Sequence, residues 1–436
     1  MLAALQIASL LTIIPFVTEP PSQSFTLPSA IQKAIENNPD IREAEDKVHE
    51  AEALGGLAWS KVLPSVSGLL QANTQKDAVG IGTPRFNGDA YNLYTAELTG
   101  FQPIYSWGLF SGLNGSRLEG QIKREELKIS KRDLGLNVMN AYYKILLAKN
   151  QLGSLQKNEK IEREVLKTAE HRHQIGRGQL LDVLQIKTQL ALLNPKIEKA
   201  SNDLKSAASE LAHLLGDPNA NEIQIEGRLD APHWEEFSIL ISKIPSEIPE
   251  IKRIQFLEKQ TSDTTSNSLG KYWPQLNAQG SWGKTGTKKT ALVDDFGTFW
   301  SVGLQLNVPI FSGLGWYFEK QSLESKEAQV LDQEMSLRNS IGLQQVKTRK
   351  DIDSAASLIH SNEEAAKLAA TSLSEATRSY RFATIDYVRY LAAEQSLLDS
   401  ELALDQARFD YIGLLGKYFS ASGYDIQILV KSLASG

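Results

Sequence analysis

The stretch PIYSWGLFSG at residues 103–112 is nearly repeated as PIFSGLGWYF at residues 309–318, which lies 206 positions later. In both copies an alternating polar and apolar segment leads up to the proline, and a long helical pattern follows the glycines. A period of about 200 residues is far longer than the 20–50 residues of a solenoid repeat. The pattern therefore indicates that a whole domain has been duplicated.

Other landmarks recur at nearly the same offset. VLPSV at 62–66 corresponds to YWPQL at 272–276, and HQIGRGQLLDVL at 173–184 corresponds to YRFATIDYVRYL at 380–391. Each half then predicts a helix, two strands, a long helix and a final helix, with the first helix beginning near a proline, Pro39 or Pro249. The expected division is a signal peptide at 1–22, a first repeat at 23–216, a linker at 217–248, a second repeat at 249–420 and a C-terminal segment at 421–436.

Composition excludes several classes of protein. The 436-residue chain is 42% hydrophobic and 22% charged, with a net charge of −6 and no block of basic residues, so nucleic acid is not an expected partner. The absence of cysteine excludes disulfides, thiolate metal sites and a cysteine nucleophile. The chain contains no Walker loop, no GxGxxG and no GxSxG motif. We therefore expect neither an enzyme nor a cofactor.

The N-terminal stretch MLAALQIASLLTIIPFV is apolar but shorter than the roughly 20 residues that span a membrane. Its length is typical of the apolar core of a signal peptide. The first basic residue is Lys33, so the basic segment that usually precedes such a core is missing. The alternative is a buried N-terminal helix.

Four segments alternate with a period of two, which predicts half-buried strands. They lie at 66–73, 93–100, 275–282 and 300–308, and the first alternates only partly. Aromatic residues gather near the strand ends, as they do in the girdles of membrane β-barrels. A soluble β-sandwich would give the same alternation. Four strands cannot close a barrel alone, and their edges would need cover.

The long helices carry a seven-residue repeat, which implies left-handed supercoiling. In the first half Leu127, Leu134, Ala141, Ala148 and Leu155 are spaced by sevens. An unbroken helix from Gly112 to Ile175 would reach about 95 Å at 1.5 Å per residue. Such a length indicates that the helix spans a distance larger than one compact domain.

Strand pairs flanked by very long helices, in two copies, resemble the TolC-type outer-membrane efflux protein family over roughly residues 25–420. The resemblance implies an α+β membrane protein that forms a homotrimer, in which each chain gives four strands to a 12-stranded transmembrane β-barrel. The barrel would continue into a long α-helical coiled-coil periplasmic tunnel, with an equatorial belt near 217–250 and the C-terminal segment. The implied location is the outer membrane, with a large periplasmic part.

The resemblance also implies a function. It predicts a passive exit duct of a tripartite efflux or type I secretion system, fed by an inner-membrane transporter through a periplasmic adaptor protein. The competing hypothesis is an envelope-associated coiled-coil scaffold without a pore. The apolar faces of the strands argue against the scaffold, because lipid is the surrounding that such faces require.

Two sets of site residues follow from the resemblance. The adaptor-docking tips of the two helical hairpins are expected at Ile175, Gly176, Arg177, Phe382, Ala383 and Thr384, where Gly176 and Gly178 are predicted to supply the positive φ of the first turn. A gate at the periplasmic mouth is expected at Asp182, Tyr380 and Arg389, with Asp182 bonded to Tyr380, Arg389 or both. Ile385 stands where the family has an arginine partner, and Arg389 stands where it has an acidic ring.

Two apparent metal sites have simpler interpretations. His171 and His173 are two residues apart on a helix and point to different faces, so a solvated pair is the better interpretation. Asp294 and Asp295 fit either an external calcium site or a plain acidic turn.

Overall fold

The computed structural model describes residues 24–76, 90–217, 223–232, 248–288, 297–424 and 430. Both halves show the expected order of elements, and α1, which precedes the first repeat's helix, was not predicted. The expected signal peptide at 1–22 and the pair Asp294–Asp295 lie outside the described residues. The elements are β1 (Ser24–Phe25), α1 (Leu27–Asn37), α2 (Pro39–Ser60), β2 (Ser65–Gln75), β3 (Tyr91–Tyr105), α3 (Leu109–Gln174), α4 (Leu180–Leu214), β4 (Gln224–Ile225), α6 (Pro249–Leu269), η1 (Gly270–Tyr272), β5 (Gln275–Gly286), β6 (Thr298–Asn307), α7 (Gly315–Arg381) and α8 (Tyr387–Ala421).

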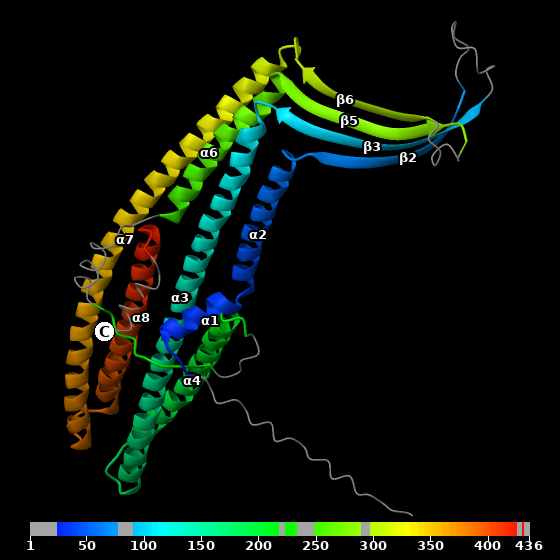
Figure 1. Ribbon diagram of the computed structural model, residues 1–436. Helices are drawn as coiled ribbons and strands as arrows, with labels where there is room; N and C mark the ends of the chain where they lie inside the picture. The colour runs from blue at the N-terminus through cyan, green and yellow to red at the C-terminus, as the bar shows by residue number, and fades with distance from the viewer. Residues whose placement is uncertain are drawn as a thin grey trace, which may run out of the picture.

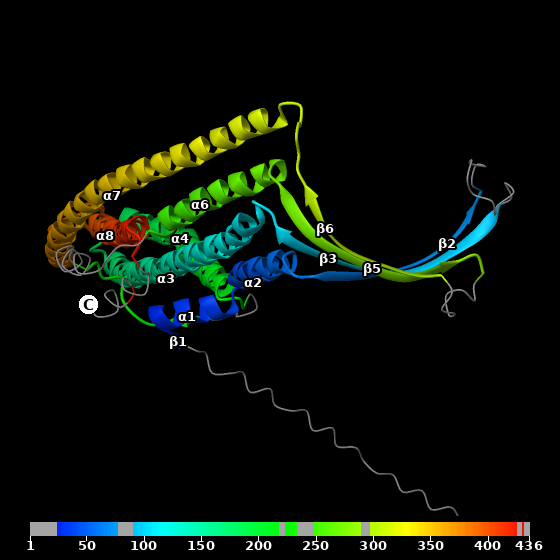
Figure 2. The ribbon, with the colours of Figure 1, turned by 45° about the horizontal axis from the view of Figure 1, so that its top comes forward.

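The molecule is elongated, with a four-stranded sheet at one end and helices at the other (Figures 1 and 2). Helices α3 and α7 contain 66 and 67 residues, which corresponds to about 100 Å each at 1.5 Å per residue. Each turns back into a 35-residue partner, α4 or α8, so that two long hairpins point away from the sheet. The predicted giant helices are confirmed. Within the described residues no helix combines the length and the apolar character needed to cross a membrane.

Prolines set the ends of the shorter helices. Pro39 and Pro249 occupy the first turn of α2 and α6, where a missing N–H costs nothing. The Asn38 side chain accepts a hydrogen bond from the Asp40 N–H at 2.8 Å and so caps α2. Both helices end before Pro64 and Pro274, the prolines that precede β2 and β5.

The sheet has the order β2-β3-β5-β6, and all its pairs are antiparallel. Residues directly opposite each other share a face, and the register places Leu98 opposite Trp282 and Trp282 opposite Trp300. One face is therefore almost wholly apolar across the four strands: Val66, Gly68, Leu70 and Ala72; Tyr94, Ala96, Leu98 and Gly100; Leu276, Ala278, Gly280 and Trp282; and Trp300, Val302, Leu304 and Leu306. The strand at 66–73, which alternates weakly in sequence, fits this face without exception.

The opposite face of the sheet is mainly polar. Hydroxyl pairs cross it between neighbouring strands, with Ser67 Oγ 2.6 Å from Thr99 Oγ1 and Ser281 Oγ 2.8 Å from Ser301 Oγ. The apolar face remains uncovered, because Leu70 is 83% exposed and Val302 is 81% exposed. The strands β2 and β6 form the two edges of the sheet. A sheet with one apolar face, one polar face and two open edges needs an environment that this chain alone does not supply.

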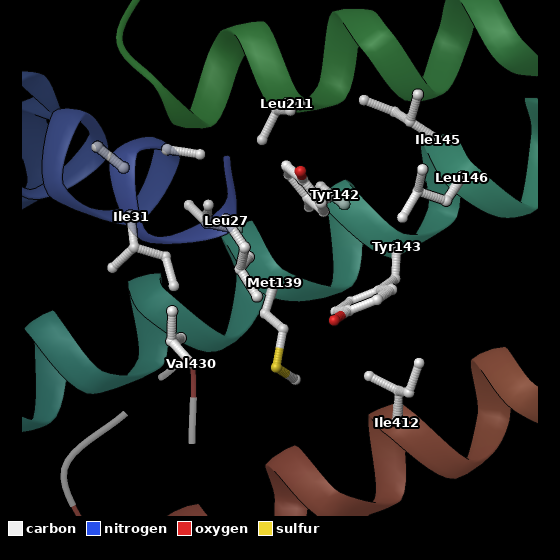
Figure 3. Packing of buried hydrophobic residues seen from close by; sticks show 14 of the residues in the cluster. Leu27, Ile31, Met139, Tyr142, Tyr143, Ile145, Leu146, Leu211, Ile412 and Val430 are labelled. Carbon is white, nitrogen blue, oxygen red and sulfur yellow. The ribbon is translucent and has the colours of Figure 1, made fainter. Parts of the chain in front are cut away.

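The main core lies midway along α3, where α1, α4 and α8 pack against it (Figure 3). The predicted seam of α3 is buried there, as Leu134, Ala141 and Ala148 show. The Tyr142 hydroxyl donates hydrogen bonds to the backbone carbonyls of Phe25 and Glu226, which ties the β1–β4 pair to α3. The core gathers α1, α3, α4 and α8 with the segments near residues 229 and 430. Both repeats therefore share one core.

Candidate functional site at the helical hairpin tips

The first hairpin turns between α3 and α4. Gly176 has a φ of 72°, a left-handed conformation that glycine adopts without steric cost. The Gly176 N–H donates to the His173 carbonyl at 3.0 Å, and the Arg177 N–H donates to the Arg172 carbonyl at 2.8 Å. These bonds satisfy carbonyls in the last turn of α3. The prediction is thus confirmed for Gly176.

The prediction is wrong for Gly178, whose φ is not positive. A Cβ at that position would lie 2.9 Å from the Cβ of Arg172 and 3.0 Å from the backbone nitrogen of His173. Glycine is therefore required at 178 because the chain passes close to the end of α3. The glycine at 178 correctly marks the turn, but it is needed for the close approach of the chain to α3 and not for a positive φ.

The second hairpin repeats the same turn without a glycine. Ala383 has a φ of 58°, which is uncommon for a residue with a side chain. Its N–H donates to the Tyr380 carbonyl at 3.0 Å, and the Thr384 N–H donates to the Ser379 carbonyl at 2.9 Å. Phe382 next to it is 75% exposed. Both predicted tip triplets thus lie at the reversals, and their docking role stays a prediction.

Arg172 links the two hairpins and was missed by the sequence reasoning. Its guanidinium donates to the carbonyl of Tyr380 at 3.0 Å and to the carbonyl of Arg381 at 2.6 Å. It also lies 5.4 Å from the centre of the Tyr380 ring. A cation at the carbonyl end of α7 is favoured by the helix dipole. The basic last turn of α3 can be recognised in the sequence, but the sequence does not show that Arg172 would cap α7.

The structure brings Asp182 and Tyr380 close together. Tyr380 is only 6% exposed, and its ring stacks on Tyr390 at 5.4 Å between centroids. Burial, followed by the Asp182 charge, raises the pKa of Tyr380, while Arg172 opposes the shift. Burial and then the Asp386 charge raise the pKa of Asp182. Within the described residues no hydrogen bond joins Asp182 to Tyr380.

Arg389 lies in the first turn of α8 and is exposed. Its backbone N–H donates to the Asp386 side chain at 3.0 Å, which caps the helix. Among the described contacts of the single chain, no ion pair joins the Arg389 guanidinium to Asp182. The three predicted gate residues thus lie in one region, and their gating role is untested.

A second group of buried polar residues lies farther from the tips. Glu162 on α3 is fully buried, and Glu394 on α8 is 3% exposed. Sequence reasoning missed both, although a signal existed: Glu162 lies seven residues after Leu155, in the same heptad series as the apolar seam. A charged residue in that series indicates a special contact between helices.

A metal or cofactor site is not evident at the tips. Among the described residues no group of three or more histidine, aspartate or glutamate side chains could hold a metal ion. His173 Nδ1 instead lies 3.2 Å from the carbonyl oxygen of Gly178 within its own turn. The histidine pair therefore has a local structural contact.

Comparison with known proteins places this architecture in a family. Residues 30–217 match the family model described as "Outer membrane efflux protein". The chain is 21% identical to the alkaline protease secretion protein AprF of Pseudomonas aeruginosa, over 92% of this chain and 86% of that protein. It is 23% identical to the outer membrane protein TolC of Salmonella enteritidis, over 90% of this chain and 80% of that protein.

Solved structures show the same fold. The outer membrane protein VceC of Vibrio cholerae superposes with a TM-score of 0.78 at 16% identity, covering 92% of this chain and 96% of that chain. The match spans both repeats, the sheet and the hairpins, so it covers the features on which the resemblance rests. Similarity to TolC-type outer membrane efflux proteins thus extends over both repeats, and the place of the chain is the outer membrane, with a large periplasmic part.

Proposed function

We propose that three copies of this chain form a passive exit duct for a tripartite efflux or type I secretion system. The observation that carries the proposal is the sheet, with its uncovered apolar face, its polar face and its two open edges. In lipid every backbone N–H and C=O must be paired, so an open sheet must close into a barrel. Two copies would give eight strands, whose interior is filled by side chains, whereas three give twelve and leave a channel.

The exposed side of α7 also favours association with further copies. Apolar residues along this helix remain exposed in the single chain, including Met335 at 64%, Leu343 at 71% and Leu368 at 71%. The seam of α3 is buried within the chain, while much of α7 has no intramolecular cover. Neighbouring copies in a helical tunnel would bury these side chains.

The duct can be tested with the purified protein. We expect it to require detergent, to have the mass of a trimer in native mass spectrometry, and to conduct ions in a planar bilayer. Solubility without detergent, or a trimer that never conducts, would favour the pore-free scaffold. The chain supplies no nucleotide-binding motif, so the energy for transport is expected from the inner-membrane transporter.

The hairpin tips are the proposed docking surface for the periplasmic adaptor. Ile175 and Phe382 are exposed at the two turns, and each lies beside a small residue, Gly176 or Ala383. A charged, bulkier side chain in Ala383→Glu should abolish export while the trimer still assembles. The matched control is Ser396→Glu, since Ser396 is exposed on α8 of the same hairpin but away from the tip. Normal export by the tip variant would remove this assignment.

The proposed gate lies just inside the same tips, where Asp182 and Tyr380 approach each other. With Arg389 in place of an acidic ring, the constriction is expected to be less cation-selective than in acid-ringed relatives. Arg389→Asp should raise cation selectivity in a bilayer, and Asp182→Ala should raise conductance, while Asp203→Ala on the exposed side of α4 should change neither. Unchanged selectivity in the first variant together with unchanged conductance in the second would refute the gate.

A further inference from the structure

Two buried carboxyl groups lie in the interior between the hairpins. Glu162 comes from α3 of the first hairpin and has no exposed surface, and Glu394 comes from α8 of the second and is 3% exposed. Glu162 lies 13 residues before Ile175, or about 20 Å from the tip at 1.5 Å per residue. Burying one charged carboxylate is costly, and burying two in contact costs more, so at least one is expected to carry a proton.

The two carboxyl groups differ in their hydrogen bonds. The Tyr387 hydroxyl donates to both oxygens of Glu162, at 3.0 and 3.1 Å. Glu394 lies close enough for the charge of Glu162 to act on it, and its buried Oε1 has no hydrogen-bond partner among the described residues. Burial, then the hydrogen bond and charge of Glu162, raise the pKa of Glu394 far above its ordinary value of 4.5. A protonated Glu394 therefore avoids placing a second negative charge in this buried site.

The geometry of α8 explains why these groups meet. Tyr387, Tyr390 and Glu394 are separated by three and four residues, so they occupy one face of the helix. That face packs against a small core with Ala169 of α3, Val183 and Ile186 of α4, and Tyr380 of α7. Four helices thus seal the pair from water.

Other charges near the pair do not neutralise it. On α3 the neighbouring polar side chain is Asn158, whose buried Oδ1 has no partner, and on α8 the buried Tyr390 hydroxyl has none. From α7, Tyr380 and Arg381 face Tyr390, and Arg381 lowers the pKa of Tyr390 while burial and Glu394 raise it. The α4 side of this core is apolar, and the nearest acid there, Asp182, acts on Tyr380. No basic side chain is therefore found beside Glu394 in the described residues.

We infer that Glu162, Tyr387 and Glu394 form a proton-dependent latch that holds the first hairpin against the second. When the hairpins separate, both carboxyl groups become hydrated and Glu394 releases its proton to water. The closed state binds one more proton than the separated state, so separation is favoured as the pH rises. Between 4.5 and the raised pKa of Glu394, the ratio of separated to closed hairpins rises about tenfold per pH unit.

The sign of this linkage follows from the direction of the shift. A carboxyl group whose pKa is raised in the closed state stabilises that state fully below pH 4.5 and loses this contribution as the pH climbs. Replacing a buried ionisable pair by apolar residues is often neutral or stabilising. A stable contact between the two hairpins therefore does not require two glutamates. A contact that is released as the pH rises would account for the two glutamates at this interface.

The test measures the distance between the hairpins directly. The chain has no cysteine, so Arg177→Cys and Thr384→Cys place one spin label on each exposed tip without any background. Labelled full-length chains are mixed with an excess of unlabelled chains, so that each measured distance lies within one chain. Pulsed electron paramagnetic resonance between pH 5 and pH 9 should show the short distance giving way to a longer, broader one.

Three variants on the labelled background decide the outcome. Glu394→Gln keeps a hydrogen-bond donor toward Glu162 but cannot ionise, and it should keep the short distance across the whole pH range. Tyr387→Phe removes a donor to Glu162 and should shift the separation to lower pH. Asp399→Asn removes an exposed carboxylate from the same helix and should behave like the unmodified sequence.

The results separate the latch from the duct. A distance that does not change with pH, or a Glu394→Gln protein with the unmodified pH dependence, would overturn the latch. The same proteins are measured in planar bilayers, because in the proposed duct separated hairpins open the mouth. A pH-dependent distance without conductance would support the latch and contradict the duct.

Discussion

Ala383 is the described residue at which backbone strain can be measured most simply. Its φ of 58° lies in the left-handed region, where a Cβ costs about 1–2 kcal/mol. Gly176 performs the same reversal in the first repeat with a φ of 72° and no Cβ. The duplicated hairpins thus keep the same turn with different residues, and only one of the two turns is strained.

Opposite substitutions at these two positions should have opposite effects. Ala383→Gly is expected to stabilise the protein by about 1 kcal/mol, because the strain is relieved. Gly176→Ala is expected to destabilise it by about 1 kcal/mol, since no atom lies within 4 Å of the added Cβ and only the φ is unfavourable. Thermal unfolding in detergent, followed by circular dichroism, measures both. Effects of the same sign would contradict this account.

At the scale of elements, Arg132 joins three helices that belong to both repeats. Its side chain on α3 is 11% exposed and donates to the two oxygens of Glu250 on α6, at 2.6 and 3.1 Å. It also donates to the Ser420 carbonyl of α8 at 3.4 Å. The planar guanidinium suits such a two-pronged contact with a carboxylate. The pair therefore holds the second repeat against the long helix of the first.

Removing this arginine should cost more than removing an exposed one. Arg132→Ala is expected to destabilise the protein by about 2–3 kcal/mol, because it leaves a partly buried carboxylate without its donors. The control is Arg163→Ala, which breaks the 2.5 Å pair with Glu159 on one exposed helix face and should cost less than about 0.5 kcal/mol. Urea unfolding of the detergent-solubilised protein gives both values. An equal cost for the two variants would show that the contact between the repeats contributes little.

The hairpins also show how a heptad pattern is used differently in the two repeats. The α3 seam is buried within the chain through Leu134, Ala141 and Leu155. In α7 the residues Ile352, Ile359, Ala366, Leu373 and Tyr380 are also spaced by sevens, but only Ile352 and Tyr380 of these are buried. The uncovered side of α7 is an expected contact for further copies, and this asymmetry supports the proposed trimer.

At the scale of the whole molecule, the two faces of the sheet should respond differently to charge. Leu304 lies on the apolar face and Gln305 lies next to it on the polar face. Leu304→Arg should cost about 2–4 kcal/mol in a bilayer near the midplane, and Gln305→Arg should cost far less because it faces the lumen of the proposed barrel. Folding into lipid vesicles, measured by urea titration, compares the two. Equal stability would mean that the faces are assigned wrongly.

The sequence by itself determined the type and order of most elements. The repeated PI-aromatic-Ser segments, the prolines and the two periodicities predicted both strand pairs and both long helices, because these signals depend on local geometry. They also identified Gly176 as a turn residue. They placed Ala383 at the second turn without indicating its positive φ, since alanine carries no signal for one, and they missed α1, although Thr26 and Pro28 stand at its start.

Only the tertiary structure decided which side chains meet across elements. Arg172 caps α7, Arg132 joins the repeats, and Glu162 shares a buried site with Tyr387 and Glu394, although these partners are between 118 and 288 residues apart in the chain. The periodicity of a helix predicts which of its faces is buried, but it does not predict which residue of another helix lies opposite. That choice depends on the offset between packed helices, which the whole core fixes at once. The candidate site was therefore located from the sequence, and its contacts came from the fold.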